Sequence, residues 1–476
     1  MLSAGIKHIH FIGIGGYGMS ALALILLQLG YRISGSDIKS SRLTHRLQEK
    51  GAIINFAHDA ANLNGSDMVV YSTAIPNDNA ELVEARRRNI PLWHRAELLA
   101  LMVNSYYGVA VAGTHGKTTT TAMLSLLLDE GGFDPTAVIG GEVNIFEGNA
   151  RLGKSRYLVA EACESDNSFL RYHPRLTVIT NIEADHLENF EGNYAKLQDA
   201  YSKFIENTHP DGVLIVCGED SQLMEKARSF CGKVVSYGIG DGFADDFPFD
   251  FTVRQLHYCH MGSRFEVYKN GDYLVSVEMK VPGRHNVLNA TASIAAAYNL
   301  GVDIHNSVEV LGKFTGAGRR FEVVGQVADV SVVDDYAHHP TEIKATLQAA
   351  QNNDNRRIIC IFQPHRFTRT QYFLSEYADS FQEADIVFLN EVYGAGEKPI
   401  VGANSRVLAE MIKQRHDTPV YYHQELDALV DSVLAEIEPG DVVITMGAGD
   451  IWKAGRQIVE ELSRRWQQSA AGSQGN

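Results

Sequence analysis

Two glycine-rich segments constrain the fold of this 476-residue chain most strongly, because each stands between an apolar run and a helical pattern. The first, GIGGYG, follows the apolar run HIHFI, and the second, GTHGKT, follows GVAVA. A buried strand, a glycine loop and a helix in this order are typical of parallel α/β sheets. The two segments therefore predict an α/β protein with doubly wound sheets.

The alternation of strand and helix patterns continues along the chain and changes character twice. We expect a Rossmann-like domain at 1–106, a central P-loop-type ATPase domain at 107–320 and a second Rossmann-like domain at 321–476, as suits a chain of this length. Within the central block, SRFEVYKNGDYLVSVEMKV alternates around the turn-forming pair Asn270-Gly271. This pattern predicts a hairpin, and hence a mixed sheet in that domain.

Composition limits the partners of the chain. Its net charge of −16 disfavours nucleic acid and acidic membrane surfaces, so any anionic ligand must be met by local basic groups. The five cysteines form no Cys-x-x-Cys pair, which suits free thiols in a reducing compartment. The longest apolar run, 21–29, is too short to cross a bilayer. We therefore expect a cytoplasmic protein with no nucleic-acid partner and no membrane insertion.

The first glycine segment matches the dinucleotide-binding fingerprint. Gly13, Gly15 and Gly18 follow the pattern G-x-G-x-x-G, and Asp37 comes at the end of the next predicted strand. Glycines let the main chain approach a diphosphate, and the carboxylate can accept a hydrogen bond from a ribose or a base. The pattern indicates a nucleotide diphosphate without specifying nicotinamide, and a merely structural tight turn is the alternative.

The second glycine segment is a shortened P-loop. Its Lys-Thr end is intact, so Lys117 can neutralise phosphate charge and Thr118 can offer a hydroxyl to Mg²⁺, but Val111 occupies the position of the usual first glycine. We expect the following helix to begin near Thr119 and to direct its N-terminus at the phosphates. A second, separate phosphate site argues against a simple dehydrogenase.

Acidic residues follow two further predicted strands of the central block. Glu161 ends one strand, and the pair Asp185-His186 comes just past the next. If the sheet is parallel, these strand ends meet near the P-loop, where oxygen ligands or a histidine can hold a metal ion for phosphoryl transfer. A purely structural role for the histidine is the competing interpretation.

Basic residues and histidines follow predicted strands of the last block. His338, His365, Arg366 and Arg369 stand where ligands meet open α/β sheets. Two arginines around one loop suit a grip on a carboxylate or a phosphate. The alternative is solvated surface charge.

The chain combines GTHGKTTT, the strand-terminal Glu161, ADHLENF, HNVLNATASIAA, GRRFE and DDYAHHPTE. In this combination, from about residue 7 to 455, it resembles the superfamily of Mur ligases and folylpolyglutamate synthetases, which form amides at the expense of ATP. Within that superfamily, GIGGYGMS, GSD, YSTAIP and FQPHRFTRT are similar to the branch that adds the first amino acid of the peptidoglycan stem peptide. The resemblance implies that the substrates are UDP-N-acetylmuramate, ATP and L-alanine, that Mg²⁺ or Mn²⁺ is required, and that an acyl phosphate is the intermediate.

Other functions stay open. Within the family, a related branch joins a whole tripeptide to the same sugar nucleotide. Outside it, a nicotinamide-dependent oxidoreductase would use the first glycine segment but not the second. A non-catalytic nucleotide sensor would need both segments but neither the acidic residues nor the arginines. The sequence leaves the oligomeric state open.

The resemblance also implies a role for each matching residue. The sugar nucleotide would be bound by Gly15, Gly16, Gly18, Met19, Ser20, Asp37, Ser72 and Asn181. ATP would be bound by Gly113, Thr114, His115, Gly116, Lys117, Thr118, Thr119, Asn289, Arg320 and Asp335. The amino acid would be held by Tyr336, His338, His365, Arg366 and Arg369. The metal ligands would be Thr118, Glu161 and His186, and the catalytic groups would be Lys117, Glu161, His186 and His338.

One position departs from the pattern of several related ligases. They carry a carbamylated lysine in the helix after the Asp-His pair, and the matching position here is Tyr201, with Lys203 two residues further on. We therefore expect no carbamate at either position.

Overall fold

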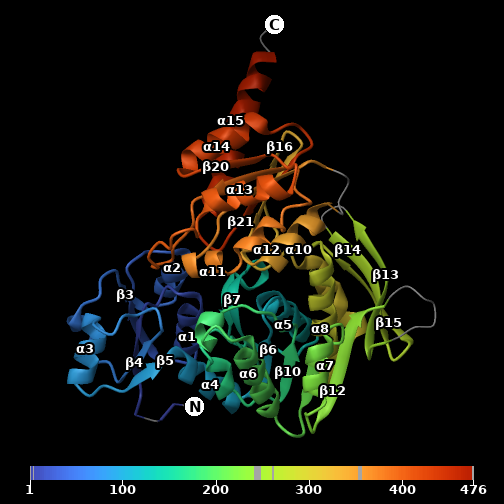
Figure 1. The fold of residues 1–476 in the computed structure, drawn as a ribbon. Helices are drawn as coiled ribbons and strands as arrows, with labels where there is room; N and C mark the ends of the chain where they lie inside the picture. The colour runs from blue at the N-terminus through green and yellow to red at the C-terminus, as the bar shows by residue number, and fades with distance from the viewer. Residues whose placement is uncertain (1, 4, 241–247, 260–261, 352–355, 474–476) are drawn as a thin grey trace. The chain divides into compact units, whose positions relative to one another are not determined.

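The structure is a computed structural model, which describes the chain except for residues 1, 4, 241–247, 260–261, 352–355 and 474–476. The described residues contain three β-sheets with helices between the strands, so the predicted α/β class is confirmed (Figure 1). They form two compact units: Met1–Gln255 with Phe265–Val277 and Leu288–Ala317, and Leu256–Arg264 with Glu278–Val287 and Gly318–Asn476. The boundaries expected at 106 and 320 stay a prediction.

The first sheet is parallel and has the strand order β3-β2-β1-β4-β5. Its strands are β1 His8–Ile12, β2 Arg32–Ser36, β3 Ile53–Asn55, β4 Met68–Tyr71 and β5 Leu92–His94. The helices between and after them are α1 Tyr17–Gln28, α2 Arg42–Glu49, η1 Ala60–Leu63, α3 Ala80–Arg87 and α4 Arg95–Ser105. The strand order reverses between β1 and β4, and the loop after β1 lies at this switch point, where open α/β sheets bind ligands.

The second sheet has the order β15-β14-β13-β12-β11-β10-β6-β9-β7-β8. Its strands are β6 Tyr107–Ala112, β7 Thr136–Val143, β8 Gly148–Arg151, β9 Tyr157–Glu161, β10 Leu176–Ile179, β11 Val213–Cys217, β12 Lys233–Ile239, β13 Phe251–Cys259, β14 Gly262–Lys269 and β15 Asp272–Met279. Its helices are α5 Lys117–Glu130, η2 Asn144–Phe146, η3 Ser168–Arg171, η4 Leu187–Phe190, α6 Tyr194–Glu206, α7 Ser221–Ala227, α8 Arg284–Leu300, α9 Ile304–Ser307 and η5 Val308–Lys313.

This sheet is mixed, as expected. The strands from β7 to β13 in the spatial order pair in parallel, whereas β8 is antiparallel to β7. The predicted turn is also present: β14 and β15 are neighbours joined by Asn270 and Gly271, with φ of 50° and 90°. Positive φ at both turn residues is what a two-residue hairpin requires.

The third sheet has the order β16-β17-β21-β18-β19-β20. Its strands are β16 Glu322–Val327, β17 Val330–Asp335, β18 Ile358–Phe362, β19 Ile386–Asn390, β20 Val420–His423 and β21 Val442–Met446. Its helices are α10 Pro340–Gln351, α11 Phe367–Tyr372, α12 Leu374–Ala378, α13 Ser405–Arg415, α14 Leu426–Glu436 and α15 Trp452–Ser473. All its pairs are parallel except β16 with β17, an edge hairpin that the sequence does not predict.

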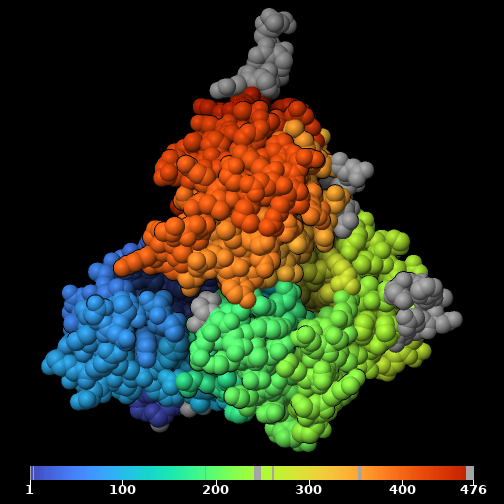
Figure 2. Space-filling view, viewed as in Figure 1, coloured from blue at the N-terminus to red at the C-terminus, as the bar shows by residue number. Residues whose placement is uncertain are grey.

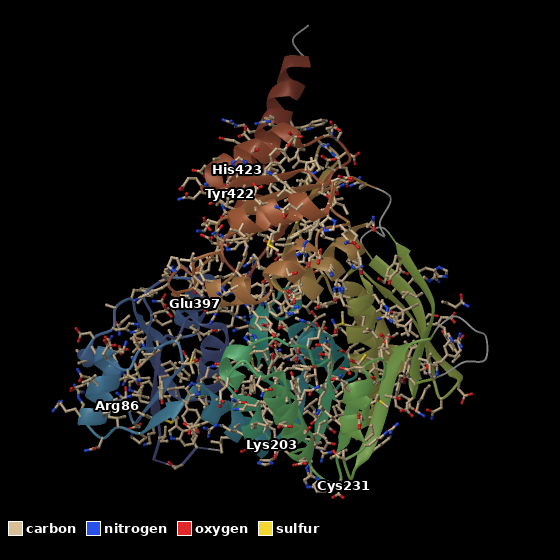
Figure 3. All side chains as sticks on the ribbon, in the orientation of Figure 1. Arg86, Lys203, Cys231, Glu397, Tyr422 and His423 are labelled. Carbon is tan, nitrogen blue, oxygen red and sulfur yellow. The ribbon has the colours of Figure 1, made fainter. Side chains whose placement is uncertain are left out.

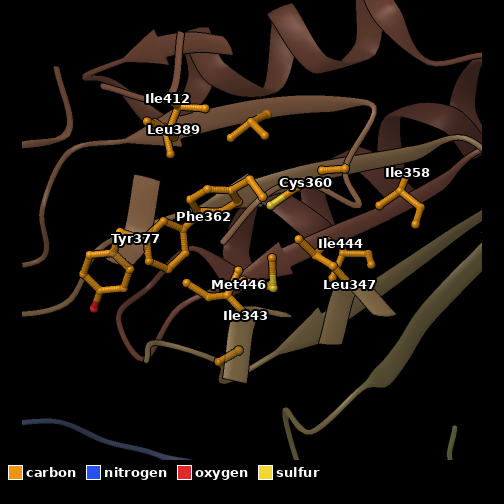
Figure 4. Packing of buried hydrophobic residues seen from close by; sticks show 14 of the residues in the cluster. Ile343, Leu347, Ile358, Cys360, Phe362, Tyr377, Leu389, Ile412, Ile444 and Met446 are labelled. Carbon is orange, nitrogen blue, oxygen red and sulfur yellow. The ribbon is translucent and has the colours of Figure 1, made fainter. Parts of the chain in front are cut away.

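Both faces of the third sheet are buried. Along β18, Ile358, Cys360 and Phe362 belong to one apolar cluster (Figure 4), while Ile359 and Ile361 belong to a second cluster. Because successive strand residues point to opposite faces, each face of β18 must be covered by helices. This burial explains the unbroken apolar runs in the sequence. Among the helices of the described residues, none is both long and apolar enough for a bilayer crossing.

Candidate functional site

The loop after β1 is closed by main-chain and carboxylate hydrogen bonds. The N–H groups of Gly13 and Ile14 donate to the carbonyl of Ser36, and the Gly15 N–H donates to Asp37 Oδ2 over 2.8 Å. Asp37 therefore holds the glycine loop from the end of β2. Because residue 16, the N-cap of α1, is a glycine, it has no side chain to occupy the first N–H groups of the helix, and this favours an anion there.

The other expected sugar-nucleotide residues divide between two places. Met19 and Ser20 are buried in the first turn of α1, and Ser72 directly follows β4, across the switch point from β1. Asn181, by contrast, contacts the P-loop: it accepts a hydrogen bond from the His115 N–H over 2.9 Å and donates one to the His115 carbonyl over 3.1 Å. Its binding of the sugar nucleotide stays a prediction.

A basic residue that the sequence does not single out lies against this loop. Arg95, the first residue of α4, has its Nη1 3.0 Å from the point where a Cβ on Gly18 would be. Its other terminal nitrogen lies 3.3 Å from Asp166 Oδ2. Arg95 thus places a positive charge, paired with Asp166, beside Gly18. It lies outside the glycine motif, so only the fold brings it there.

The P-loop lies between β6 and α5. Gly113 and Gly116 have φ of 133° and 84°, and a side chain at Gly116 would collide with the amide of Asn289. The expectation that the helix begins near Thr119 is wrong by two residues: α5 begins at Lys117. Its N-cap is Gly116 in the left-handed conformation, so the chain turns into the helix directly after that glycine.

Polar residues after β10 brace the P-loop. The Thr180 hydroxyl donates to the His115 carbonyl over 2.5 Å, and the Thr114 hydroxyl accepts from the Glu183 N–H over 2.8 Å. His115 Nε2 also lies 3.6 Å from Glu183 Oε2. On the other side, Thr120 donates to Asn289 Oδ1 over 3.2 Å. The loop is therefore held in shape before any nucleotide binds.

Lys117 is paired with a residue that the sequence analysis misses. Its Nζ donates to the carbonyls of Gly113 and Thr114 and lies 3.1 and 3.0 Å from the two carboxylate oxygens of Glu164. Burial alone would lower the pKa of Lys117, but the charge and hydrogen bond of Glu164, together with the charges of Cys163 and Glu161, outweigh burial and raise this pKa above its ordinary value. Lys117 is thus a fixed positive charge at the P-loop. The feature of the sequence that could have indicated this partner is Glu164, the second glutamate in EACESD.

Glu161 lies at the end of β9 against main chain of β7. Its Oε1 accepts a hydrogen bond of 2.5 Å from the Gly140 N–H, and a Cβ on Gly140 would lie 2.6 Å from Oε2. A Cβ on Gly141 would likewise lie 3.2 Å from Cγ2 of Thr118. The main chain at these two glycines therefore lies against two of the expected metal ligands. The third, His186, has its Nε2 3.6 Å from Asp185 Oδ2, and a shared metal stays a prediction.

The position that matches a carbamylated lysine in related ligases is occupied differently. Tyr201 on α6 is fully buried, and burial raises its pKa well above the ordinary value. Lys203, labelled in Figure 3, is exposed on the same helix. The absence of a carbamate at these two positions stays a prediction.

In the second unit, Asp335 ends β17 in a buried position. Its carboxylate accepts hydrogen bonds of 2.7 Å from the N–H groups of Phe321 and Ala337. Burial raises its pKa to about 6, against the opposing charge of Arg320. Arg320 lies over the ring of Tyr336, with 4.9 Å from its guanidinium carbon to the ring centroid. Their predicted roles toward ATP are not tested by these contacts.

The residues expected to hold the amino acid lie near one another in this unit, although the side chain of Arg366 is partly exposed. The ring of His338 lies 5.4 Å from that of Tyr336 and 6.1 Å from that of His365. Arg369, whose residue is 8% exposed, has a terminal nitrogen 3.3 Å from His365 Nδ1. The side chain of Arg366 is 41% exposed and pairs with Glu397 at 3.6 Å. Arg369 is therefore the more enclosed of the two arginines.

Profiles of one family match most of the chain. The description "Mur ligase family, catalytic domain" applies to residues 8–107, "Mur ligase middle domain" to 111–297 and "Mur ligase, glutamate ligase domain" to 319–449. Among similar sequences is a UDP-N-acetylmuramate–L-alanine ligase of Pelotomaculum thermopropionicum, 44% identical over 96% of this chain and 98% of its own length. A protein of the same name from Geobacter sulfurreducens is also 44% identical, over 96% and 98% of the two chains.

Solved structures give the same picture. The crystal structure of a UDP-N-acetylmuramate-alanine ligase from Thermotoga maritima matches with a TM-score of 0.81 at 32% identity, covering 97% of this chain and 99% of that one. A murein peptide ligase from Psychrobacter arcticus matches with a TM-score of 0.70 at 26% identity, covering 96% and 99%. Both likenesses extend over all three sheets.

Proposed function

The chain belongs to the Mur ligase family, and from that premise we propose that it is an ATP-dependent ligase that joins L-alanine to the lactyl carboxylate of UDP-N-acetylmuramate. The products would be the amide, ADP and phosphate, and the reaction belongs to the synthesis of peptidoglycan precursors. Similarity of 42–44% over almost the whole chain to proteins named for this activity supports the assignment.

The observation that carries this function is that one compact unit contains two separate glycine-rich loops, each leading into a helix whose N-cap is a glycine. The loop at Gly13–Gly18 suits the diphosphate of the sugar nucleotide, and the loop at Gly113–Thr118 suits the phosphates of ATP. A nicotinamide-dependent oxidoreductase would need only the first loop. The braced P-loop and the Lys117–Glu164 pair would then have no function.

The chemistry follows from the weakness of a carboxylate as an acylating agent. An oxygen of the lactyl carboxylate attacks the γ-phosphate of ATP and forms an acyl phosphate, whose phosphate is a good leaving group. The neutral amine of alanine then attacks the acyl carbon, and the tetrahedral intermediate collapses to amide and phosphate. Lys117 offsets the charge that develops on the transferring phosphoryl group, which is the dominant need in such reactions.

A divalent cation, Mg²⁺ or Mn²⁺, is part of the proposal. The residues that would hold it are Thr118, Glu161 and His186, two of which offer the oxygen ligands that these cations prefer. Gly140 donates its N–H to the Glu161 carboxylate, and Gly141 lies against the methyl group of Thr118, so both expected oxygen ligands border the same pair of glycines in β7, which supports one cation shared between them. Once bound, the cation would supply positive charge to the phosphates.

The remaining predicted roles belong to the same proposal. Arg369, with Tyr336, His338, His365 and Arg366 near it, would hold the carboxylate of alanine. Asn289, Arg320 and Asp335 would contact ATP. We also propose a cytoplasmic location, since the reaction consumes ATP and the five cysteines, all within the described part of the chain, are free thiols.

Phosphate release tests this function and its nearest rival. The enzyme is incubated with ATP, Mg²⁺ and UDP-N-acetylmuramate, and phosphate is measured with L-alanine, with other amino acids or with the stem tripeptide. We expect release with L-alanine. Release with the tripeptide alone would assign the chain to the recycling branch, which includes the less similar murein peptide ligases. Nicotinamide binding without ATP hydrolysis would support an oxidoreductase.

A further inference from the structure

The hairpin formed by β7 and β8 packs against the N-terminal part of its own unit. β8 is the last strand of the ten-stranded sheet, and α1 contacts both β7 and β8. In the space-filling view this N-terminal part, in blue, adjoins the central part, in green (Figure 2). The sheet that carries the P-loop therefore reaches the helix that carries the sugar-nucleotide loop.

One buried side chain of β8 makes polar contacts with the first turn of α1. The amide nitrogen of Asn149, a residue that is 2% exposed, donates to the carbonyl of Tyr17 over 2.5 Å and to the hydroxyl of Ser20 over 3.0 Å. The Ser20 hydroxyl in turn donates to the Tyr17 carbonyl over 3.1 Å. Tyr17 and Ser20 belong to the first turn of α1, whose N–H groups face the glycine loop. Asn149 thus fixes that turn at two points.

Further contacts hold the hairpin in place. Arg42 at the start of α2 pairs with Glu142 over 3.2 Å, and Arg46 of the same helix donates to the carbonyls of Phe146 and Glu147. At its other end, β7 contributes the Gly140 N–H that binds Glu161. The hairpin is therefore anchored in β7 and in the turn that leads to Asn149, which limits how far this side chain can follow α1 if the helix shifts.

We propose that Asn149 is a positioning residue of the sugar-nucleotide site, supplied by the central sheet. It acts through the first turn of α1, not by touching the ligand. Asp37 and Ser36 hold the loop that precedes α1, but the N-cap glycine provides no side chain to fix the first turn of the helix, and the donor from β8 supplies contacts there. Placement within a fraction of an ångström decides how well main-chain N–H groups meet a diphosphate. The inference rests on the proposed function for the identity of the ligand.

Steady-state kinetics of the full-length enzyme test this role. We expect Asn149→Ala to raise the KM for UDP-N-acetylmuramate by about five- to tenfold, as for the loss of one or two neutral hydrogen bonds, and to leave the KM for ATP and for L-alanine within about twofold. Asn149→Asp keeps the shape but lacks the amide donor, so it should behave like the alanine variant. Asn144→Ala, an exposed position on the same hairpin, is the matched control and should leave all three KM values unchanged.

Calorimetric titration separates this inference from the proposed function. UDP-N-acetylmuramate is titrated into each variant without ATP, and a non-hydrolysable ATP analogue serves as the folding control. Weaker sugar-nucleotide binding by Asn149→Ala with unchanged analogue binding supports the role. Equal loss for both ligands, an unchanged sugar-nucleotide affinity, or full recovery in Asn149→Asp would overturn it. If the wild type binds the sugar nucleotide but releases no phosphate with alanine, the proposed function fails and the titration still decides the role of Asn149.

Discussion

Removing the carboxylate of Glu164 should destabilise the protein through Lys117. The side chains of Glu164 and Lys117 are 1% and 14% exposed, so the pair is almost fully removed from water. Loss of one partner of a buried ion pair costs about 3 to 5 kcal/mol of unfolding free energy. Here Lys117 keeps the carbonyls of Gly113 and Thr114 as acceptors, which places Glu164→Ala at the lower end, about 3 kcal/mol. Glu164→Gln retains an acceptor oxygen and should cost about 1 to 2 kcal/mol.

Urea unfolding of the ligand-free protein measures this effect, with a double-mutant cycle to assign it. Lys117→Met alone leaves a buried carboxylate, and the double variant Lys117→Met/Glu164→Gln removes both charges. The double variant should therefore lose at least about 1 kcal/mol less than the sum of the single losses. Glu206→Gln, an exposed position on α6, is the control and should stay within about 0.5 kcal/mol of the wild type.

The ion pair between Lys117 and Glu164 also determines how the difference in unfolding free energy between the wild type and Glu164→Gln depends on pH. The pKa of Lys117 is raised, so its contribution is fully present below the ordinary lysine value and is lost only when the pH rises above it. The difference between wild type and Glu164→Gln should therefore be constant between pH 7 and about 9. Additive losses in the cycle, or a difference that disappears within this range, would refute the ion pair as the cause.

Three further predictions address other parts of the chain. Burial raises the pKa of Asp335 to about 6, so the folded state holds this proton more tightly, and the unfolding free energy should fall by about 2 kcal/mol as the pH rises from 4 to 6. Urea unfolding of Asp335→Asn should lack this slope, and an unchanged slope would contradict the assignment. Glu81 is buried, and hydrogen bonds from His10, Ser36 and Asn62 overcome burial and lower its pKa to about 2, so its contribution is present above pH 4.5 and lost below it. Glu81→Gln should thus cost roughly 3 kcal/mol at pH 7, and its difference from the wild type should shrink as the pH falls below 4.5; a difference independent of pH would count against this. Arg369→Ala should raise the KM for L-alanine by at least about thirtyfold and leave the KM for ATP nearly unchanged, because truncation of a buried charged partner costs about 2 to 5 kcal/mol. If Arg366→Ala, at the more exposed position, raised the KM for L-alanine more than Arg369→Ala, then Arg366 would be the main ligand of the alanine carboxylate.

Apart from the alternating hairpin of β14 and β15, most strands that the sequence predicts are apolar runs buried by the sheet on both faces. β6 and β18 are examples, and both end where the sequence places polar or glycine residues. The hairpin of β16 and β17 escapes prediction because its turn is Ala328-Asp329, a pair without the glycine that marks such turns, although both residues have positive φ. The short hairpin of β7 and β8 also escapes prediction, because its register is irregular.

The candidate site is predictable only where chemistry is concentrated in a short motif. Gly15, Asp37 and Lys117 follow from the two glycine segments. Glu164 and Arg95 do not, because their partners lie 47 and 71 residues away in the sequence and meet them only in the folded chain. Hydrogen bonds between distant residues carry no periodicity, so a single sequence gives no sign of them.

The glycines beside the phosphate site also limit how this protein can change under selection. At Gly116 a side chain would collide with Asn289, and at Gly140 with Glu161, so the surface there is main chain that substitution cannot easily reshape. An inhibitor whose affinity came from contacts with this stretch of backbone would leave the cell few single substitutions that weaken binding and still preserve the enzyme.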